Sequence, residues 1–398
     1  MLAYAFYESD MRILRYAKAL VDRGDSVDVI ALRREGAPAF EVLQGVNVYR
    51  VQPRQRNERG WFDYLTRVIR FMLVSAVKLT RLHSAQPYDV VHVHSVPDFL
   101  VFSAIWPKLT GARIILDIHD ILPEFFASKF GASSKSLLFK LLVLAEYLSV
   151  KMSDHVIIAN DLWHQRLVAR SASAERCTSI INYPDSDIFK PSEHRPIGEP
   201  KFRITYPGTL NTHQGVDIAV RAMHILRDEL PKAEFHVYGE GPAKPALVEL
   251  TSQLALSERV IFHNFLPCDQ IAGAMALSDI AVVPKRASSP FGNEAMSTKI
   301  MEFMSLGVPV IVARTKVDEY YHDESRVKFF ESDNAADLAR AIALLYRDPE
   351  LRQSLASQAS EYVSHNNWSE KKQIYLKIVD SLSAGAKQVP DPVASQVN

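Results

Sequence analysis

Short apolar runs alternate along the chain with longer segments in which apolar residues recur at helical spacing. The runs at 280–284 (IAVVP) and 308–312 (VPVIV) are too short for helices and rich in valine and isoleucine, which is typical of buried strands in a parallel sheet. Between them, 294–307 (EAMSTKIMEFMSLG) has helical periodicity and ends at Gly307, where a glycine commonly terminates a helix. This alternation predicts an α/β fold with parallel sheets.

The alternation occurs in two series, one on each side of residues 182–191 (NYPDSDIFKP). That segment contains two prolines and no periodicity, so we predict a hinge there. A chain of 398 residues also exceeds the usual size of one domain. We therefore predict a first domain over 1–185 and a second domain over 186–366.

Composition and charge exclude several classes of protein. Basic and acidic residues are equal at 46 each, which argues against a nucleic-acid-binding protein. Cys177 and Cys268 form no C-x-x-C motif and predict neither a zinc site nor a disulfide framework, which fits a reducing compartment such as the cytoplasm. The first residues lack the pattern of a signal peptide, and no apolar run is long enough to span a bilayer.

The segment 61–82 (WFDYLTRVIRFMLVSAVKLTRL) predicts an amphipathic helix in which basic residues stand among aromatic and aliphatic ones. Such a helix either lies on an anionic membrane surface or packs on a sheet while its long basic side chains extend to solvent. The sequence favours the packed helix and leaves the membrane-surface helix open.

Candidate chemistry concentrates in the stretch 280–312. Glu294 and Glu302 are eight positions apart, which on one continuous helix places both carboxylates near one face. Lys285 and Arg286 follow the predicted strand at its carboxyl end, where ligands bind in open α/β sheets. Cations, hydroxyl-binding carboxylates and free N–H groups at a helix start describe a site for a phosphorylated sugar.

A glutamate, seven residues, a second glutamate and then G-V-P-V-I resembles the signature of the retaining GT-B-fold nucleotide-sugar glycosyltransferases, the glycosyl transferases of group 1 or family 4. The resemblance implies two Rossmann-like parallel-sheet domains that face a central cleft, an acceptor-side domain at 1–185 and a donor-binding domain at 186–366. It further implies a helix at 367–383 that returns to the first domain. We expect a disordered tail at 384–398. Related sequences usually have a few residues before the first strand, and the sequence leaves open whether the native N-terminus is longer.

The resemblance also assigns residues to roles. It implies that Glu294 contacts the donor sugar, that Glu302 binds the ribose, and that His119 lies near the sugar and the acceptor, with weaker claims for Asp120 and Glu124. The catalytic candidates are thus His119 and Glu294, and the expected reaction needs neither a metal ion nor a cofactor. The donor-binding candidates are Gly208, Thr209, Gln214, Gly215, Gly239, Gly241, Leu266, Lys285, Arg286, Phe291, Gly292, Asn293, Ser297, Thr298, Lys299 and Glu302.

Two positions depart from the family pattern. Members commonly have an arginine after the glycine that matches Gly208 and a lysine before the one that matches Gly215. Here these residues are Thr209 and Gln214. Either Lys285 and Arg286 replace the missing cations, helped by His213 if it is protonated, or donor binding is weak.

The expected function is retaining transfer of a sugar from a nucleoside-diphosphate donor to a glycan or lipid-linked acceptor, in surface polysaccharide synthesis. The expected place is the cytoplasm, with peripheral contact at the inner membrane face through 61–82 as an open alternative, and nucleic acid is not expected as a partner. A second interpretation, permitted by Thr209 and Gln214, is a non-catalytic GT-B-like subunit that binds nucleotide sugars or regulates another enzyme. A GT-B epimerase or phosphorylase is a third, although no motif for a pyridoxal lysine is present.

Overall fold

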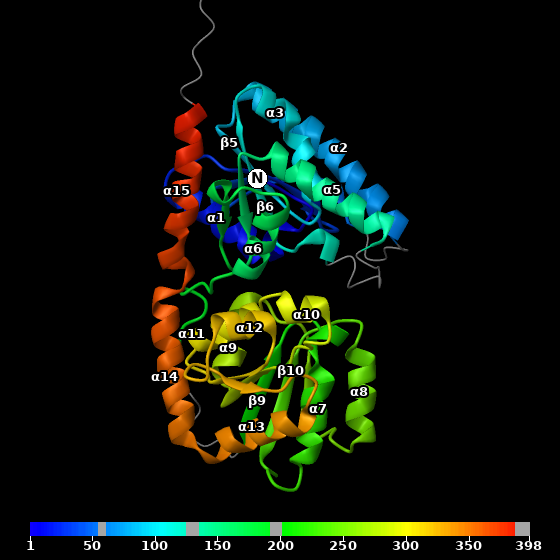
Figure 1. Cartoon of the computed structure of the whole chain (residues 1–398), viewed down its shortest axis with the longest axis vertical. Helices are drawn as coiled ribbons and strands as arrows, with labels where there is room; N and C mark the ends of the chain where they lie inside the picture. Colours follow the sequence, from blue (N-terminus) through cyan, green and yellow to red (C-terminus); the bar gives the residue numbers. More distant parts are fainter. Residues whose placement is uncertain (55–60, 125–134, 192–200, 387–398) are drawn as a thin grey trace, which may run out of the picture. The chain divides into compact units, whose positions relative to one another are not determined.

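The structure is a computed structural model that describes residues 1–54, 61–124, 135–191 and 201–386. The chain divides into two compact units, Met1–Asn182 with Lys372–Asn398, and Tyr183–Lys371. Residues 387–398, most of the segment predicted to be a disordered tail, lie outside the described residues. Each unit is an α/β sandwich with its own sheet (Figure 1).

The first unit contains a sheet of eight described strands in the order β3-β4-β2-β1-β5-β6-β7-β8. All neighbouring strands are parallel except β3 and β4, which form an antiparallel hairpin at one edge. The strands are β1 (Leu2–Ala3), β2 (Asp28–Arg33), β3 (Phe40–Leu43), β4 (Val46–Pro53), β5 (Val90–His94), β6 (Arg113–Ile118), β7 (His155–Ile158) and β8 (Cys177–Ser179).

Helices cover both faces of this sheet, as parallel strands buried on both sides require. Figure 1 shows α1 and α15 on one face and α2, α3 and α5 on the other. The helices of the unit are η1 (Tyr7–Ser9), α1 (Met11–Asp22), α2 (Trp61–Ala85), η2 (Asp98–Ala104), α3 (Ile105–Leu109), α5 (Leu137–Met152), α6 (Asp161–Arg170) and η3 (Ala174–Arg176), where η marks a 3-10 helix.

The second unit contains six described strands in the order β11-β10-β9-β12-β13-β14, all of them parallel. This order is that of a Rossmann sheet, with the reversal of strand order between β9 and β12. Its strands are β9 (Phe202–Pro207), β10 (Ala233–Tyr238), β11 (Val260–His263), β12 (Ile280–Val283), β13 (Val310–Ala313) and β14 (Lys328–Phe330). Its helices are η4 (Thr212–Gln214), α7 (Val216–Ile225), α8 (Lys244–Gln253), α9 (Cys268–Ala276), α10 (Pro290–Glu294), α11 (Thr298–Ser305), α12 (Lys316–Tyr321), α13 (Ala335–Arg347) and α14 (Pro349–His365).

Helix α15 (Trp368–Ala386) begins in the second unit and continues in the first from Lys372 onward. Its side chains complete the core of the first unit, because Tyr375 is fully buried and contacts Tyr16 of α1 at a ring distance of 4.2 Å. The helix runs three residues into the segment predicted to be a tail.

Candidate functional site

A pocket of about 270 Å³ lies in the second unit at the carboxyl ends of β9 and β10. This is the sheet edge beside the reversal of strand order, where ligands bind in doubly wound folds. The pocket is lined by Phe189, Pro207, Gly208, Thr209, Tyr238, Gly239, Glu240, Phe265, Leu266, Cys268, Ile271, Met275, Thr298, Lys299 and Glu302. Seven of the predicted donor-binding residues therefore meet in one place: Gly208, Thr209, Gly239, Leu266, Thr298, Lys299 and Glu302.

Backbone atoms of two glycines form the floor of this pocket. Pro207 and Tyr238 are paired in the sheet, so the next residues, Gly208 and Gly239, leave the sheet side by side. Gly239 has a φ of +150°, and a Cβ atom on it would lie 2.0 Å from the carbonyl oxygen of Gly208. Only glycine fits this close approach, and it leaves the main chain open to a ligand.

Replacing Gly239 with alanine should destabilise the fold by about 1–3 kcal/mol, because the methyl group meets backbone rather than a movable side chain. Gly273 is the matched control, since it lies on α9 with no atom within 4 Å of an added Cβ. Gly273→Ala should instead stabilise by about 0.5–1 kcal/mol. Urea unfolding of both variants measures this, and equal effects would contradict the tight fit at Gly239.

Lys299 is the single basic residue among the described residues that line the pocket. Its side chain packs against the face of Gly208, where a Cβ would lie 2.3 Å from the lysine Cε, and its Nζ lies 5.6 Å from the centre of the Tyr206 ring. Burial lowers the pKa of Lys299, partly opposed by the nearby charge of Glu302. A desolvated ammonium group at a pocket wall is suited to binding an anion.

The first turn of α11 adds N–H groups to the same wall. Thr298 and Lys299 are the first residues of this eight-residue helix, and the preceding Ser297 has an extended backbone and a buried hydroxyl group. The first N–H groups of a helix have no partner within the helix and carry its positive dipole end. Together with Lys299 they are suited to binding an anion such as phosphate.

The prediction of one continuous helix from Glu294 to Glu302 was wrong. Helix α10 ends at Glu294, and α11 starts at Thr298 after an extended Ala295. A continuous helix needs the Ala295 carbonyl oxygen as an acceptor within the helix, but that oxygen instead accepts a hydrogen bond of 2.8 Å from Lys285 Nζ. The break exposes a second helix start, and the two carboxylates do not share one helical face.

Lys285 and Arg286 do not line the pocket. Lys285 is buried and forms an ion pair of 2.7 Å with Asp318. Arg286 is paired with Asp217 at 2.6 Å and also with Asp333. Both cations are therefore already neutralised by carboxylates of the same unit. These ion pairs tie the 284–294 loop to the rest of the unit.

A second group of predicted residues surrounds the contact between η4 and α10. A Cβ on Gly215 would lie 1.9 Å from the Pro284 carbonyl oxygen, and one on Gly292 would lie 2.3 Å from the Arg286 carbonyl oxygen. The rings of His213 and Phe291 are 5.5 Å apart. Gly215 and Gly292 thus permit the close packing of two loops beside the pocket.

The polar members of this group are engaged within the unit. Gln214 Oε1 accepts a hydrogen bond from the Tyr206 hydroxyl group, and Asn293 Oδ1 accepts one from the Lys316 N–H group. Burial, followed by Lys299 and Lys285, lowers the pKa of His213, so this ring is neutral at pH 7 and supplies no positive charge. Gly241 packs against the backbone of Leu210.

The two glutamates occupy different surroundings. Glu302 lies on α11 and lines the pocket beside Lys299. Glu294 is the last residue of α10, largely buried, and is paired at 3.4 Å with the exposed Lys316. Glu294 does not line the pocket as Glu302 does.

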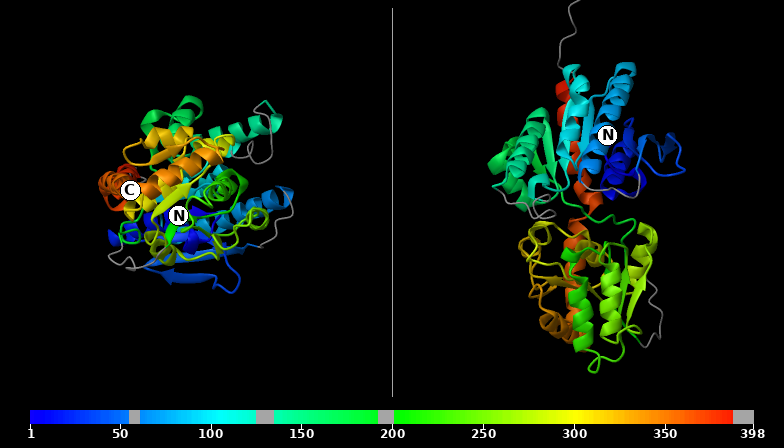
Figure 2. Two further views of the ribbon diagram at one scale, coloured as in Figure 1. Left: turned by 90° about the horizontal axis from the view of Figure 1, so that it is seen from below. Right: turned by 90° about the vertical axis from the view of Figure 1, so that its right-hand side faces the viewer.

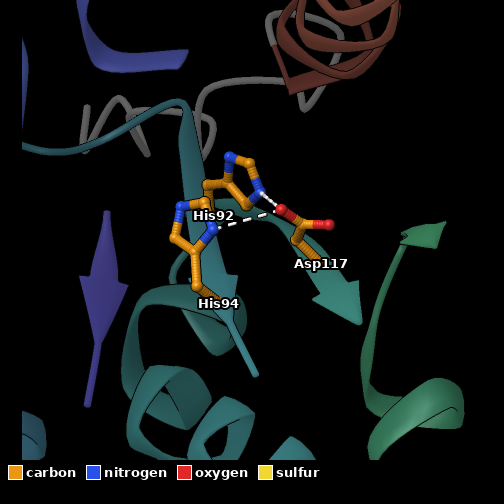
Figure 3. Close-up of side chains that lie close together, drawn as sticks. All are labelled: His92, His94 and Asp117. Atoms are coloured by element: carbon orange, nitrogen blue, oxygen red, sulfur yellow. Dashed lines mark hydrogen bonds and ion pairs between the residues drawn. The ribbon is translucent and has the colours of Figure 1, made fainter. Parts of the chain in front are cut away.

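In the first unit, His119 belongs to a buried polar cluster at the carboxyl ends of β5 and β6. Its Nε2 atom lies 3.2 Å from Asp117 Oδ2, and His94 Nδ1 lies at the same distance from that oxygen. Figure 3 shows Asp117 of β6 with both histidines of β5, His92 and His94. Burial would lower the pKa of His119, but Asp117 opposes this effect and the pKa is raised.

Arg12 of α1 closes this cluster from the other side. Its guanidinium group binds both carboxylate oxygens of Asp117, at 2.7 and 2.8 Å, and donates to the Ile180 carbonyl oxygen. Burial alone would raise the pKa of Asp117, but Arg12 and His119 hold it well below its usual value. Asp117 is thus a carboxylate that holds His119 in place.

The atoms of His92, His94 and Asp117 are close enough to be considered as metal ligands, all within 4.8 Å of one another. The guanidinium group of Arg12 already occupies both oxygens of Asp117, and a divalent cation beside it would be repelled. The cluster is better described as a hydrogen-bonded network. It extends to α15, because the Tyr375 hydroxyl group lies 3.1 Å from His92 Nδ1.

The two weaker candidates after His119 differ from each other. Burial raises the pKa of Asp120 to about 6, with His119 opposing this effect. Glu124 is paired at 2.7 Å with Arg170 of α6. Glu124 is therefore held by an ion pair, whereas burial dominates the surroundings of Asp120.

Arg12, Asp117 and His94 were not among the functional residues predicted from the sequence. The available signal was a charged residue, Arg12, beside apolar residues that recur at helical spacing, together with Asp117 two positions before His119. The pocket is also lined by residues that were not predicted from the sequence: Tyr238, Cys268, Ile271 and Met275. These are ordinary core residue types, and only the fold shows that they border a cavity.

Two family models match most of the chain in succession. Residues 10–182 match the model described as glycosyl transferase 4-like domain, and residues 188–362 match glycosyl transferases group 1. The chain belongs to the group 1 glycosyltransferases. The family and the GT-B fold class that the sequence predicted are thereby confirmed.

Relatives of this glycosyltransferase agree with that assignment. An uncharacterized glycosyltransferase of Methanocaldococcus jannaschii is 27% identical over 318 residues, which are 75% of this chain and 74% of the relative. Sucrose-phosphate synthase from Thermosynechococcus elongatus has a TM-score of 0.76 at 17% identity, over 96% of this chain and 99% of that structure. HepE of Anabaena, in complex with UDP-glucose, has a TM-score of 0.71 at 18% identity, over 96% and 98%. At these identities the structures show the shared fold.

Proposed function

We propose that this glycosyltransferase transfers a sugar, with retention of configuration, from a nucleoside-diphosphate donor to a glycan or lipid-linked acceptor in surface polysaccharide synthesis. The observation that carries the proposal is the pocket of the second unit, where Lys299 and the start of α11 meet a floor of glycine backbone. A diphosphate fits these donors, and Glu302 on the same wall supplies a carboxylate for ribose hydroxyls. HepE, which has the same fold, was solved with UDP-glucose, so UDP is the first nucleotide to test.

In the proposed reaction, the bond between the anomeric carbon and the diphosphate oxygen breaks while the acceptor oxygen bonds to that carbon from the same face. The acceptor proton goes to the departing phosphate oxygen. Negative charge grows on the diphosphate as the bond breaks, and Lys299 with the α11 N–H groups stabilises it most at that stage. Because these groups belong to the protein, we propose that no metal ion is needed.

The remaining roles extend the same proposal. Glu294 holds hydroxyl groups of the donor sugar, and His119 positions that sugar. Asp117 raises the pKa of His119 and so shifts the ring toward its charged form, in which both ring nitrogens donate hydrogen bonds. A donor of this kind is suited to binding a sugar hydroxyl group and unsuited to acting as a nucleophile.

Lys285 and Arg286 are assigned to the support of this site. Their carboxylate partners leave them no net charge to offer a diphosphate, so they act on the donor through the loop that they hold. The other candidates around η4 and α10, Gly215 and Gly292 among them, contribute by setting the position of that loop beside the pocket.

One observation favours a second candidate function. With Thr209 and Gln214 at the usual cation positions, the described pocket wall has Lys299 as its single basic side chain. A non-catalytic subunit that binds nucleotide sugars or regulates another enzyme would tolerate this weaker charge. The two functions differ in whether donor is consumed.

The deciding experiment measures thermal stabilisation and slow donor hydrolysis with UDP-, GDP- and ADP-glucose. An enzyme should show a raised melting temperature with one nucleotide and release of free sugar, both unchanged by excess EDTA. Stabilisation without hydrolysis, or no response to any nucleotide, would support the non-catalytic subunit. Dependence on an added divalent ion would contradict the metal-free proposal.

Glu294→Ala should reduce donor hydrolysis and transfer by roughly 100-fold or more, because the sugar loses a carboxylate that holds its hydroxyl groups. The fold should survive, since the partner that loses its ion pair, Lys316, is exposed. Glu319→Gln is the matched control: its exposed carboxylate pairs with the partly exposed Arg314 and has no proposed role. Unchanged activity in Glu294→Ala would remove this assignment.

Peripheral contact with the inner face of a membrane through residues 61–82 belongs to the proposal as well. Helix α2 buries Val68 and Phe71 but leaves Leu73 and Val77 more than half exposed. Among the described residues, no helix has the length and apolar character needed to cross a bilayer. The contact that we propose therefore lies along a membrane surface.

A further inference from the structure

Large apolar side chains are unevenly exposed in the described structure. More than half of those exposed to solvent lie on three helices of the first unit, α2, α3 and α5. These helices cover the same face of the sheet, and both α2 and α5 pack on the 3-10 helix η2, which leads into α3 (Figure 1). The right-hand view of Figure 2 looks onto this helical layer.

The outer side of α5 is the most apolar part of this layer. Leu137, Leu141, Leu144 and Leu148 are 73%, 52%, 50% and 46% exposed, and their spacing of four, three and four residues places them in one stripe. The opposite side of the helix packs inward. A surface helix normally turns polar residues outward, so a leucine stripe of this length indicates a contact.

The charges on α5 are arranged around this stripe. Lys140 and Lys151 are exposed, and on a helix of 3.6 residues per turn they lie on the same side as Leu144. The single acidic residue of α5, Glu146, is buried, where it is paired with Arg170 and accepts a hydrogen bond of 2.6 Å from Ser171. The exposed side of α5 is therefore apolar and positive, with no negative charge.

Helix α2 continues the same combination. Leu73 and Val77 are exposed one turn apart, and Arg70 and Arg81 are exposed beside them. The single acidic residue of α2 is Asp63, which forms an ion pair of 2.7 Å with Arg67. Trp106 and Leu109 of α3 add further exposed apolar area.

We propose that the outer face of α2, α3 and α5 docks on an anionic lipid bilayer, with the leucine stripe of α5 at its centre. The leucines enter the boundary between head groups and acyl chains, and Lys140 and Lys151 contact lipid phosphates. This inference extends the membrane contact proposed for 61–82 to α5 and does not depend on the transfer activity. In this proposal the leucine stripe of α5 contributes most of the binding, whereas the earlier proposal concerned residues 61–82 alone.

The charges favour a lipid surface over a second copy of the chain. In a symmetric dimer through this face, Lys140, Lys151, Arg70 and Arg81 of one copy would oppose the same set on the other. The described outer faces of α2 and α5 offer no unpaired carboxylate to compensate. A bilayer that contains anionic phosphates matches this pattern.

The test is flotation of the full chain with vesicles of phosphatidylcholine alone or mixed with phosphatidylglycerol. The unaltered chain should float with the mixed vesicles, less so at high salt, and remain at the bottom with phosphatidylcholine alone. The double variant Leu141→Gln with Leu144→Gln should lose roughly tenfold or more in partitioning. Lys140→Gln with Lys151→Gln should lose roughly tenfold in partitioning and become less sensitive to salt, with Arg70 and Arg81 retaining the rest of that sensitivity.

Leu344→Gln is the matched control, because Leu344 is a 42% exposed leucine on a helix of the second unit, α13. It should float like the unaltered chain. Absence of flotation with the mixed vesicles would overturn the proposal, as would flotation of the leucine variant equal to that of the control. A dimer in sedimentation that the leucine variant abolishes would assign the face to a second copy instead.

Thermal stabilisation by UDP separates this inference from the proposed function. All of the surface variants should keep the nucleotide response of the unaltered chain, because none of the altered residues lines the donor pocket. Loss of flotation with an intact nucleotide response therefore concerns the membrane face alone. A chain that floats but never responds to nucleotide would contradict the proposed function and leave the docking face in place.

Discussion

Replacing Lys299 with methionine should lower kcat/KM for sugar transfer by about 100- to 1,000-fold, the usual cost of removing one preorganised group that stabilises developing negative charge. Lys299 is the single basic side chain on the described pocket wall, so no neighbouring cation there compensates for the loss. Methionine keeps an aliphatic stem that fills the space between Gly208 and Tyr206. Steady-state kinetics and UDP affinity measure the effect.

The same substitution should leave stability unchanged or slightly raised. Burial lowers the pKa of Lys299, which means that its charged form is disfavoured where it stands. Lys244→Met is the control, because Lys244 lies near the pocket but is paired with Glu240 at 2.6 Å. If Lys299→Met kept full kcat/KM and UDP affinity, the phosphate site would have to lie elsewhere.

Asp117→Asn should destabilise the protein by about 3–5 kcal/mol, because the substitution leaves the buried guanidinium group of Arg12 without its carboxylate. Asp22→Asn removes an exposed ion pair with Lys18 and should change stability by about 0.5 kcal/mol or less. Urea unfolding of both variants compares the two sites. A loss at Asp117 no larger than at Asp22 would contradict the described network.

The pH dependence of this stability difference follows from the lowered pKa of Asp117. The folded-state pKa of Asp117 is depressed, so its contribution to stability is fully present above the unfolded pKa of about 3.9 and is lost as the pH falls through the folded value. The advantage of the unaltered chain over Asp117→Asn should therefore hold at neutral pH and shrink only in acid.

A double variant separates the effect of Asp117 on the stability of the fold from its effect on the pKa of His119. Arg12→Met with Asp117→Leu removes both charges, and replacing a buried ion pair with apolar side chains is often nearly neutral in stability. The pKa of His119 should still fall, because Asp117 is the group that raises it against burial. The alkaline limb of the pH profile of transfer should then move to lower pH, whereas a purely structural role would leave that limb in place.

Fold and family could be predicted because they depend on signals that are local in sequence. The valine- and isoleucine-rich run at 280–283 became β12, and Gly307 follows α11 with a positive φ. The antiparallel β3 was not predicted, since two of its four residues are exposed and it has no buried apolar run. Strand order itself could be inferred only through the family resemblance.

The details of the site could not be predicted because they depend on contacts between distant residues. Lys285 and Arg286 follow a strand at its binding end, yet Asp318, Asp217 and Asp333 neutralise them. The helical periodicity continues through Ala295, although a lysine ten residues earlier takes its carbonyl oxygen. Arg12 and Asp117 are 105 residues apart, and nothing local to either of them indicates the pair.

The placement of α15 has a consequence for the order in which the molecule acquires its structure. Tyr375 and Val379 are buried in the first unit, although the ribosome makes them after the whole of the second unit. Residues 1–182 therefore lack the contacts of Tyr375 with Tyr16 and His92 until the last helix has been synthesised. During that interval it presents an unfinished apolar surface to chaperones, and a nascent chain that stops before Lys372 should be a target for proteolysis.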